Sequence, residues 1–430
     1  MAQLGSLTEV SGTGTAGPAA GPAATPARRR VGWRTVPLVV FVTAVLLSVT
    51  RVITGANDLT SSGSAGAALR LAVPILLAGL AGLWAERAGV VNIGLEGMMV
   101  LGTWSGAYVA LDHGPWAGVL AGILGGALGG LLHAVATVTF GVDHIVSGVA
   151  LNLLGPGVAR FLSALVFTGR QGGGVTQSPQ VRQPPTFTVP GLSSGLLSLE
   201  KHHWFGVSDV AGILGGLVTG TSWVTLMALL LVPFSFVVLW WTPFGLRLRS
   251  CGENPYAAES LGVNVYLYKY LAVICSGGFA GLAGAFLSLV ASNYYREDQT
   301  GGRGFIGLAA MIFGNWRPGG LAAGAGLFGY ADALQLRQGE TSVHALLLGF
   351  GLALVLFAGS LFARRQRAVG GVAAVLALGV LALYQFTDTI PQQFTTATPY
   401  VTTLLVLTLA SQRLRMPAAD GHVYRKGTAR

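Results

Sequence analysis

Residues 210–246, VAGILGGLVTGTSWVTLMALLLVPFSFVVLWWTPFGL, contain no Asp, Glu, Lys or Arg. Four further runs, residues 114–142, 270–295, 368–387 and 389–412, are equally free of these charged residues. Each run reaches or exceeds the roughly 20 residues that a helix needs to cross a bilayer. A large soluble helical core would need charged outer faces, which these runs lack. The sequence therefore predicts an all-α, polytopic membrane protein.

The overall composition supports the same class. Only 10% of the 430 residues are charged, whereas a soluble domain is about a quarter charged. The net charge of +10 comes mostly from arginines in short hydrophilic breaks. This placement is typical of the positive-inside bias of membrane proteins and not of a basic face that binds nucleic acid. We expect membrane lipid around the protein and no nucleic-acid partner.

The N-terminal segment, residues 1–34, is predicted to be a disordered cytoplasmic tail. Residues 1–26 are rich in Gly, Ala, Pro, Ser and Thr and lack the apolar core of a signal peptide. Four arginines hold this end inside: Arg28, Arg29, Arg30 and Arg34. Residues 35–412 form the membrane domain, and residues 413–430 form a cytoplasmic C-terminal tail.

Membrane crossings alternate from this starting point. The predicted spans in the first two thirds are residues 36–49, 67–85, 93–111, 116–140, 145–167, 223–241 and 270–291. Residues 169–221 then form an external loop with a short surface helix near 211–218. Residues 242–268 form the largest internal loop.

The last third requires a broken segment. If residues 304–334 formed one span, Arg364, Arg365 and Arg367 would lie outside. We therefore expect residues 304–314 to run inward, 315-NWRPGG-320 to turn, and residues 321–334 to run outward. Spans at 341–362, 373–384 and 400–410 follow. The total is about 10–12 membrane segments, including broken or re-entrant helices, which must be buried in protein or line a cavity.

Two glycine patterns concern packing. Gly118, Gly122, Gly126 and Gly130 recur every four residues, and Gly277 and Gly281 repeat the spacing. Small residues on one helix face let helices approach closely in lipid, so structural packing explains them. Separately, residues 93-IGLEGMM-99 resemble 306-IGLAAMI-312. Paired irregular segments of this kind point to a midplane site in transporters, although chance matches are common in so simple a composition.

Catalytic and metal-binding motifs are absent from the sequence. None of the three lysines follows a glycine, so there is no Walker A loop. The seven histidines show no metal-ligand spacing, and Cys251 and Cys275 are expected to be free, unreactive thiols. We expect no catalytic residue, no metal and no cofactor, and we therefore do not expect an enzyme.

Glu96 is the ionisable residue that requires an explanation. A carboxylate inside an apolar span is costly, and it marks a functional site by default. An inward-facing Glu96 would accept hydrogen bonds from a polar solute, with Asn92 one turn before it. The alternative is a structural lock in which Glu96 pairs with an arginine such as Arg160. Glu86 and Arg87, at a span end, are expected to anchor the interface.

The internal loop contains a short helix. Asn254 as N-cap, Pro255 at the first position and Gly262 at the end define it, and Asn264 caps the next span. Such a helix between two spans suits docking into a partner's groove. The alternative is a plain interfacial helix.

These stretches resemble a known family. Residues 87-RAGVVNIGLEGMM-99, 244-FGLRLRSCGENPYAAESLGVNV-265, 276-SGGFAGLAGAF-286 and 302-GRGFIGLAAMIFGNWRPGGLAAGAGLFGYADALQLR-337 are similar to permease subunits of ABC importers. The superfamily is that of the ribose and branched-chain amino acid permeases, and the closest branch is the nucleoside type. The resemblance implies the ABC-importer permease fold and a bacterial plasma-membrane location.

The resemblance also implies partners and roles. The partners would be a cytoplasmic ABC ATPase, a second homologous permease subunit and an extracellular substrate-binding lipoprotein. Asn92 and Glu96 would lie near the substrate pathway. The ATPase-coupling residues would be Glu253, Asn254, Pro255, Ala257, Ala258 and Glu259. Nucleosides or related purine compounds would be the cargo; the alternatives are simple sugars, branched-chain amino acids, a proton-coupled secondary carrier using Glu96, or a membrane enzyme.

Overall fold

The computed structural model describes residues 35–395 and 414–427. The chain divides into two units, residues 1–43 and 44–430. The first contributes the opening turns of α1, over residues 35–43, and all other elements belong to the second. The predicted tail at residues 1–34 and the predicted span at residues 400–410 lie outside the described residues.

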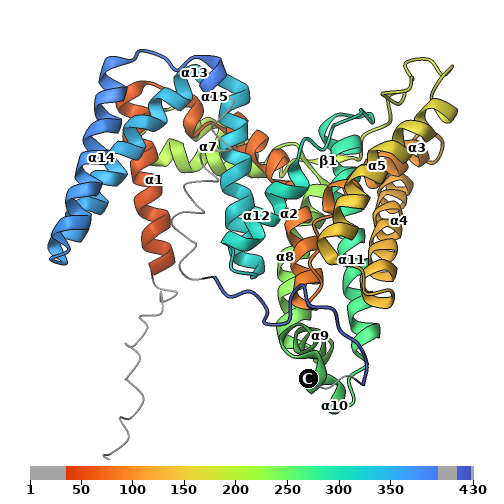
Figure 1. The fold of residues 1–430 in the computed structure, drawn as a ribbon. Coiled ribbons are helices and arrows are strands. Elements are labelled where there is room, and N and C mark those ends of the chain that lie inside the picture. Colours follow the sequence, from red (N-terminus) through yellow and green to blue (C-terminus); the bar gives the residue numbers. More distant parts are fainter. Residues whose placement is uncertain (1–34, 396–413, 428–430) are drawn as a thin grey trace, which may run out of the picture. The chain divides into compact units, whose positions relative to one another are not determined.

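The described residues are almost entirely helical (Figure 1). The helices before the internal loop are α1 (Thr35–Thr54), α2 (Ser62–Arg87), α3 (Leu95–His113), α4 (Pro115–Ala134), α5 (His144–Val166), α6 (Leu192–Glu200), α7 (Val207–Val218) and α8 (Trp223–Trp241). Those from the loop onward are α9 (Pro243–Glu253), α10 (Pro255–Ser260), α11 (Val265–Phe286), α12 (Arg303–Phe313), α13 (Pro318–Ala363), α14 (Arg367–Phe386) and α15 (Gln392–Thr395).

Short irregular elements complete the chain. A 3-10 turn, Asn57–Leu59, precedes α2, and π-helical turns extend α4 and α11 over Val135–Thr139 and Leu287–Ala291. Strands β1 (Thr186–Phe187) and β2 (Thr221–Ser222) pair antiparallel, with Thr186 opposite Ser222. This pairing joins the middle of the predicted external loop, residues 169–221, to its C-terminal end.

Seven helices in the described part of the chain are long and apolar enough to cross a membrane. They are α2, α4 with its π turn, α5, α8, α11 with its π turn, the second part of α13, and α14. The apolar parts of α1, α7 and α12 are shorter. The prediction of an all-α, polytopic membrane protein is confirmed. The predicted helix near residues 211–218 is α7, which begins four residues earlier than expected.

Helices α2 and α11 form the interior. About 72% of the apolar window of α2 and 78% of that of α11 are buried, against 17–39% in the other long spans. α2 contacts α7, α11, α12 and α13, and α11 contacts α4 and α3. A helix that is apolar on all sides belongs in the interior of a bundle, which explains why these two lack a lipid-facing stripe.

The glycine stripes of α4 and α11 face each other. A Cβ atom at Gly126 would press against the backbone of Gly277 and Gly281, and one at Gly130 would meet Gly277 and the carbonyl oxygen of Val273. Side chains are therefore excluded along this contact. The packing prediction is confirmed, and the structure adds that the two stripes are partners.

The predicted turn at 315-NWRPGG-320 joins α12 to α13. Asn315 and Trp316 both have positive φ, 53° and 51°, and Pro318 occupies the first turn of α13. The turn prediction is confirmed. The predicted loop between spans 321–334 and 341–362 is wrong, because helical hydrogen bonding continues through it and α13 has 46 residues.

A straight helix of 46 residues would measure about 69 Å, more than twice the hydrocarbon thickness of a bilayer. Helix α13 is not straight: its teal first part lies beside α12 and its blue second part lies beside α14 (Figure 1). Leu59 belongs to one buried cluster with Leu334 and Ala345, on both sides of the expected loop. The chain therefore changes direction here without leaving helical hydrogen bonding.

Candidate functional site

A non-helical stretch, residues 88–94, separates α2 from α3 and lies largely buried among the helices. Two histidines bind the backbone of Val91. Nε2 of His133 lies 3.1 Å from the carbonyl oxygen of Val91, and the N–H of Val91 donates to Nδ1 of His144 at 3.3 Å. The Asn152 side chain donates to the carbonyl of Ile93 at 2.8 Å. Non-helical backbone at membrane depth requires such protein partners.

Asn92 is fully buried within this stretch. Its Nδ2 donates to Oγ of Ser276 on α11 at 2.9 Å, and its Oδ1 accepts the N–H of Gly94 at 3.1 Å. Both ends of the amide are therefore used inside the protein. Asn92 therefore attaches this non-helical stretch to α11 and supports the turn at Gly94, directly before α3.

Glu96 lies in the first turn of α3 and binds the beginning of α12. Its Oε1 accepts the N–H of Gly302 at 2.8 Å, and its Oε2 accepts the N–H of Gly304 at 2.7 Å. Gly302 is the N-cap of α12 and has φ 77°, which favours glycine. A carboxylate at a helix N-terminus satisfies free amides and interacts favourably with the helix dipole.

This contact joins the two similar sequence segments. The first, residues 93–99, contains Glu96, and the second, residues 306–312, lies in α12, whose N-terminus Glu96 binds. A Cβ atom at Gly304 would lie 2.7 Å from Oε2 of Glu96, so a larger residue would separate α3 from α12. The structure thus brings the first segment, which begins with the non-helical residues 93–94, next to the helix that contains the second.

The alternative lock between Glu96 and Arg160 is not formed, because Arg160 pairs with Glu297 at 3.3 Å. The expected role of Glu86 and Arg87 also requires correction. Glu86 is not an exposed interfacial anchor: it is 6% exposed and accepts from Nε1 of Trp316 at 2.5 Å. Arg87 donates through Nη2 to the carbonyl of Trp316 at 2.6 Å. Both residues therefore attach the end of α2 to the α12–α13 turn.

The internal loop contains α10, as its caps predict, and a second helix, α9, which was not predicted. Asn254 accepts the N–H of Ala257 at 3.0 Å, Gly262 has φ 82°, and Asn264 accepts the N–H of Leu267 at 3.2 Å. Thr242 caps α9 in the same way. Helix α10 begins at the expected residue and ends at Ser260, one residue early.

The six predicted coupling residues divide by exposure. Pro255 and Ala258 are buried, and the partly buried Tyr256 packs against the same cluster as Ala258. Glu253, Asn254 and Ala257 are exposed, and Glu259 is half-buried. Sequence reasoning did not single out Leu261, which is 85% exposed at the end of α10. Burial raises the pKa of Cys251, beneath α10, to about 11, which agrees with an unreactive thiol.

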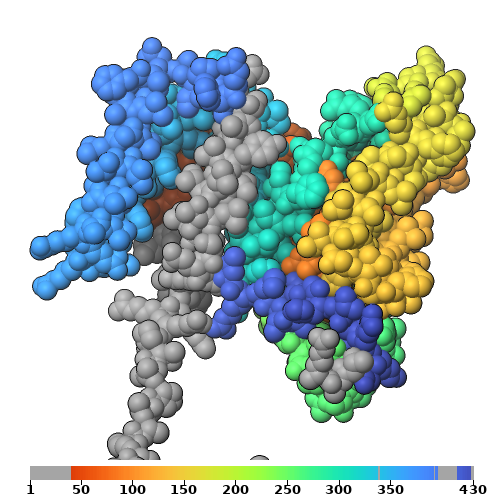
Figure 2. Space-filling model, viewed as in Figure 1, coloured from red at the N-terminus to blue at the C-terminus, as the bar shows by residue number. Residues whose placement is uncertain are grey.

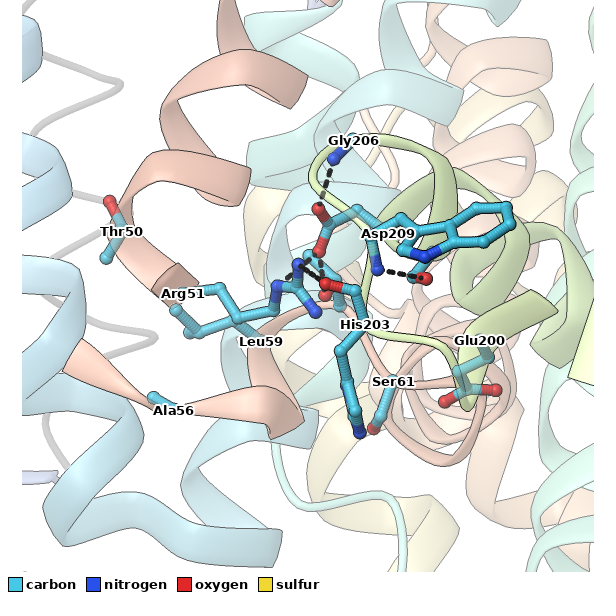
Figure 3. Close-up of polar contacts among 12 residues, drawn as sticks. Thr50, Arg51, Ala56, Leu59, Ser61, Glu200, His203, Gly206 and Asp209 are labelled. Atoms are coloured by element: carbon cyan, nitrogen blue, oxygen red, sulfur yellow. Dashed lines mark hydrogen bonds and ion pairs between the residues drawn. The ribbon is translucent and has the colours of Figure 1, made fainter. Parts of the chain in front are cut away.

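Near the C-terminal end of α1, a buried ion pair connects this helix to α7 (Figure 3). Nε of Arg51 lies 2.9 Å from Oδ1 of Asp209, and both side chains are about 5% exposed. Asp209 also accepts from the Thr60 hydroxyl and from the N–H of Gly206. Nearby, Glu200 accepts the N–H of Ser62, at the start of α2. These carboxylates anchor the predicted external loop to α1 and α2.

A cavity of ≈ 340 Å³ lies where this loop meets the bundle. Its lining includes Arg70 of α2, Gln183, Thr186 of β1 and Thr225 of α8. The volume falls at the small end of the range for small-molecule sites. No group of His, Cys, Asp and Glu side chains suited to a metal ion occurs in residues 35–395 and 414–427.

Residues 64–356 match the family model described as "Branched-chain amino acid transport system / permease component". The guanosine ABC transporter permease protein NupQ of Bacillus subtilis is 33% identical over 84% of this chain and 96% of its own length. The nucleoside ABC transporter permease protein NupC of Lactococcus lactis is 33% identical over 82% and 93%. A putative glucose ABC transporter permease protein, TsgC13 of Haloferax volcanii, is 36% identical over 66% and 80%. No solved structure matches the chain significantly.

Proposed function

Because the chain belongs to the branched-chain amino acid transport system / permease component family, we propose that it carries nucleosides or related purine compounds into the cell. The observation that supports this cargo is the extent of similarity to two relatives named for guanosine and nucleosides, which covers more than four fifths of the chain. Nearly the whole length of each relative is included, so the similarity is not restricted to one shared segment.

A simple sugar is the second candidate cargo. The Haloferax protein, named as a putative glucose permease, has the higher identity, 36%, but over only 66% of this chain. Uptake of labelled guanosine by cells that express the complete transporter distinguishes the two. We expect unlabelled adenosine to compete, and glucose, ribose and leucine not to compete. Competition by glucose alone would reassign the cargo.

The energy for transport would come from a cytoplasmic ABC ATPase bound at α10. Three features support this site: the exposed side chains of Glu253 and Asn254, the helix between them and Gly262, and the exposed apolar side chain of Leu261. An apolar side chain that inserts into a partner's groove is a common anchor. A second permease subunit and an extracellular substrate-binding lipoprotein would complete the importer, with both chain termini cytoplasmic.

Leu261→Asp tests the docking site. We expect it to lower co-purification of the ATPase about tenfold or more, because a charge would enter an apolar contact. The matched control is Leu192→Asp in α6, which alters another exposed leucine in the predicted external loop. Equal ATPase recovery with both variants would remove α10 from the docking site.

Asn92 and Glu96 would lie beside the substrate pathway and stabilise the non-helical backbone that borders it. Asn92 fixes the non-helical stretch 88–94 to α11, and Glu96 fixes the N-terminus of α12 to α3. A broken helix whose end is held by one side chain can shift as a unit when that contact changes. In this proposal, access alternates when α12 moves relative to α3.

A further inference from the structure

The C-terminal strap, residues 414–427, is attached to several elements at the α10 end of the molecule. The N–H of Arg415 donates to Oδ1 of Asn315 in the α12–α13 turn at 2.7 Å. The N–H of Ala419 donates to the carbonyl of Gly252 at the end of α9 at 2.8 Å. Figure 2 shows this segment, in dark blue, running along the lower end of the helices next to the green elements of the loop. The strap therefore connects elements that lie far apart in the sequence.

Tyr424 is the part of the strap that reaches α10. Its side chain belongs to one buried cluster with Cys251, Ala258 and Val265, which come from α9, α10 and α11. Its ring centroid lies 5.4 Å from those of Tyr256 and Tyr266. Its hydroxyl interacts electrostatically with the side chain of Glu259. Tyr424 thus contacts the side of α10 that faces the protein.

Asp420 anchors the middle of the strap. It is 5% exposed, and its carboxyl group interacts electrostatically with that of Glu86 at the end of α2, which also binds Trp316. Burial, and then the neighbouring Glu86 carboxylate, raise the pKa of Asp420 to about 9. A protonated Asp420 can donate to Glu86, so the two carboxyl groups hold the strap without repulsion.

Helix α10 needs this support because it has six residues. A helix this short has too few internal hydrogen bonds to hold its shape alone, so its position depends on packing. Pro255 and Ala258 supply small contact areas, whereas the Tyr424 ring adds a large one. The strap also binds Asn315, in the turn that follows α12. Glu96 binds the other end of α12, its N-terminus.

We propose that the C-terminal strap positions α10 against the ATPase and transmits its movement to the α12–α13 turn, with Tyr424 as the positioning residue. This inference rests on the proposed docking of the ATPase at α10. It assigns to the last residues of the chain a role in coupling ATP hydrolysis to transport. The strap is a part of the transmission and not a site of chemistry.

The test uses the complete transporter in liposomes and measures solute imported per ATP hydrolysed. We expect Tyr424→Ala to lower this ratio about tenfold, since two aromatic contacts are lost. Tyr424→Phe, which retains both ring contacts, should recover most of it. The matched control is His422→Ala, an exposed neighbour in the strap, which should leave the ratio unchanged.

Hydrogen exchange of the α10 amides gives a second readout that does not require transport. We expect Tyr424→Ala to accelerate exchange at residues 255–261 and to leave α4 and α11 protected. An unchanged ratio and unchanged exchange in Tyr424→Ala, while Leu261→Asp still releases the ATPase, would overturn the strap proposal alone. If Leu261→Asp also retains the ATPase, the docking proposal fails and the strap proposal fails with it.

Discussion

At the scale of single residues, Glu96 and Asp420 solve the same problem in different ways. Each is a carboxyl group away from bulk water, where an unpaired negative charge is costly. Glu96 receives two backbone N–H groups of one helix N-terminus, so its charged form is satisfied. Asp420 lies against Glu86, so its neutral form is favoured. The two carboxyl groups are therefore accommodated by different partners: backbone amides for Glu96 and a second carboxyl group for Asp420.

Replacing Glu96 tests the contact between α3 and α12. Glu96→Ala leaves two amides without their acceptor, and we expect a loss of about 2 kcal/mol or more in stability together with reduced uptake. Glu96→Gln retains one acceptor oxygen and should lose less in both measurements. Thermal unfolding of the purified permease and uptake by the complete transporter provide the data. Normal uptake by Glu96→Ala would exclude a role in the transport cycle.

Asp420 predicts a pH dependence of strap docking. Its pKa rises from the ordinary value of 3.8 to about 9 in the docked strap, so docking takes up a proton between these pH values. Docking should therefore weaken as pH rises from about 4 to about 9 and be independent of pH outside this range. Hydrogen exchange at Ala418 and Ala419, corrected for intrinsic rates, measures it.

Asp420→Asn is the control for this titration, because it keeps the shape and cannot ionise. Glu86, Arg87 and Lys269 also interact electrostatically with Asp420, and they remain in the variant. Any pH dependence that persists belongs to them. A slope as steep in Asp420→Asn as in the parent protein would show that Asp420 is not the titrating group.

At the scale of elements, the helix contacts depend on where small residues lie. Gly126→Ala would place a methyl group against the backbone of α11. We expect it to destabilise the fold by about 1–3 kcal/mol through overpacking. Gly157→Ala in α5 is the control, since nothing lies within 4 Å of its Cβ position. It should be neutral or slightly stabilising because alanine favours helix. Equal thermal stabilities would contradict the close packing of α4 and α11.

Local sequence patterns predicted the starts of α10 and α11 well. They could not predict contacts between residues far apart in the sequence. The caps at Asn254 and Asn264 act within three residues, so their spacing predicts the geometry. The acceptor role of Glu96 toward Gly302 spans 206 residues, and spacing cannot reveal such a partner. The roles of His133 and His144 could not be predicted either. Each binds the backbone of Val91, and a contact to backbone produces no recognisable sequence motif.

The loop predicted within α13 failed for a different reason. Residues 335–340 contain polar side chains, which favour a loop between two apolar segments. The structure keeps helical hydrogen bonds through them, because a polar helical turn at a membrane surface loses nothing by remaining helical. Composition therefore located the span in the second part of α13 and could not decide how it is joined to the preceding residues.

At the scale of the whole molecule, orientation in the membrane is the prediction to test. With the N-terminus inside, Leu261 faces the cytoplasm and Gln171 faces outward; both are exposed. In a background without Cys251 and Cys275, a membrane-impermeant thiol reagent should label Gln171→Cys in intact cells and Leu261→Cys only in inverted vesicles. The reverse labelling would invert the topology and remove the ATPase from α10.

The bond between Glu96 and α12 also bears on how the polypeptide can be divided. The carboxylate and the amides that it binds lie on opposite sides of the predicted external loop. The glycine stripes of α4 and α11 meet across the same loop. If the chain were expressed as two separate fragments cut at Gly172, each fragment would display half of these mating surfaces. The two fragments would then associate in the bilayer and form an active permease without a peptide bond between them.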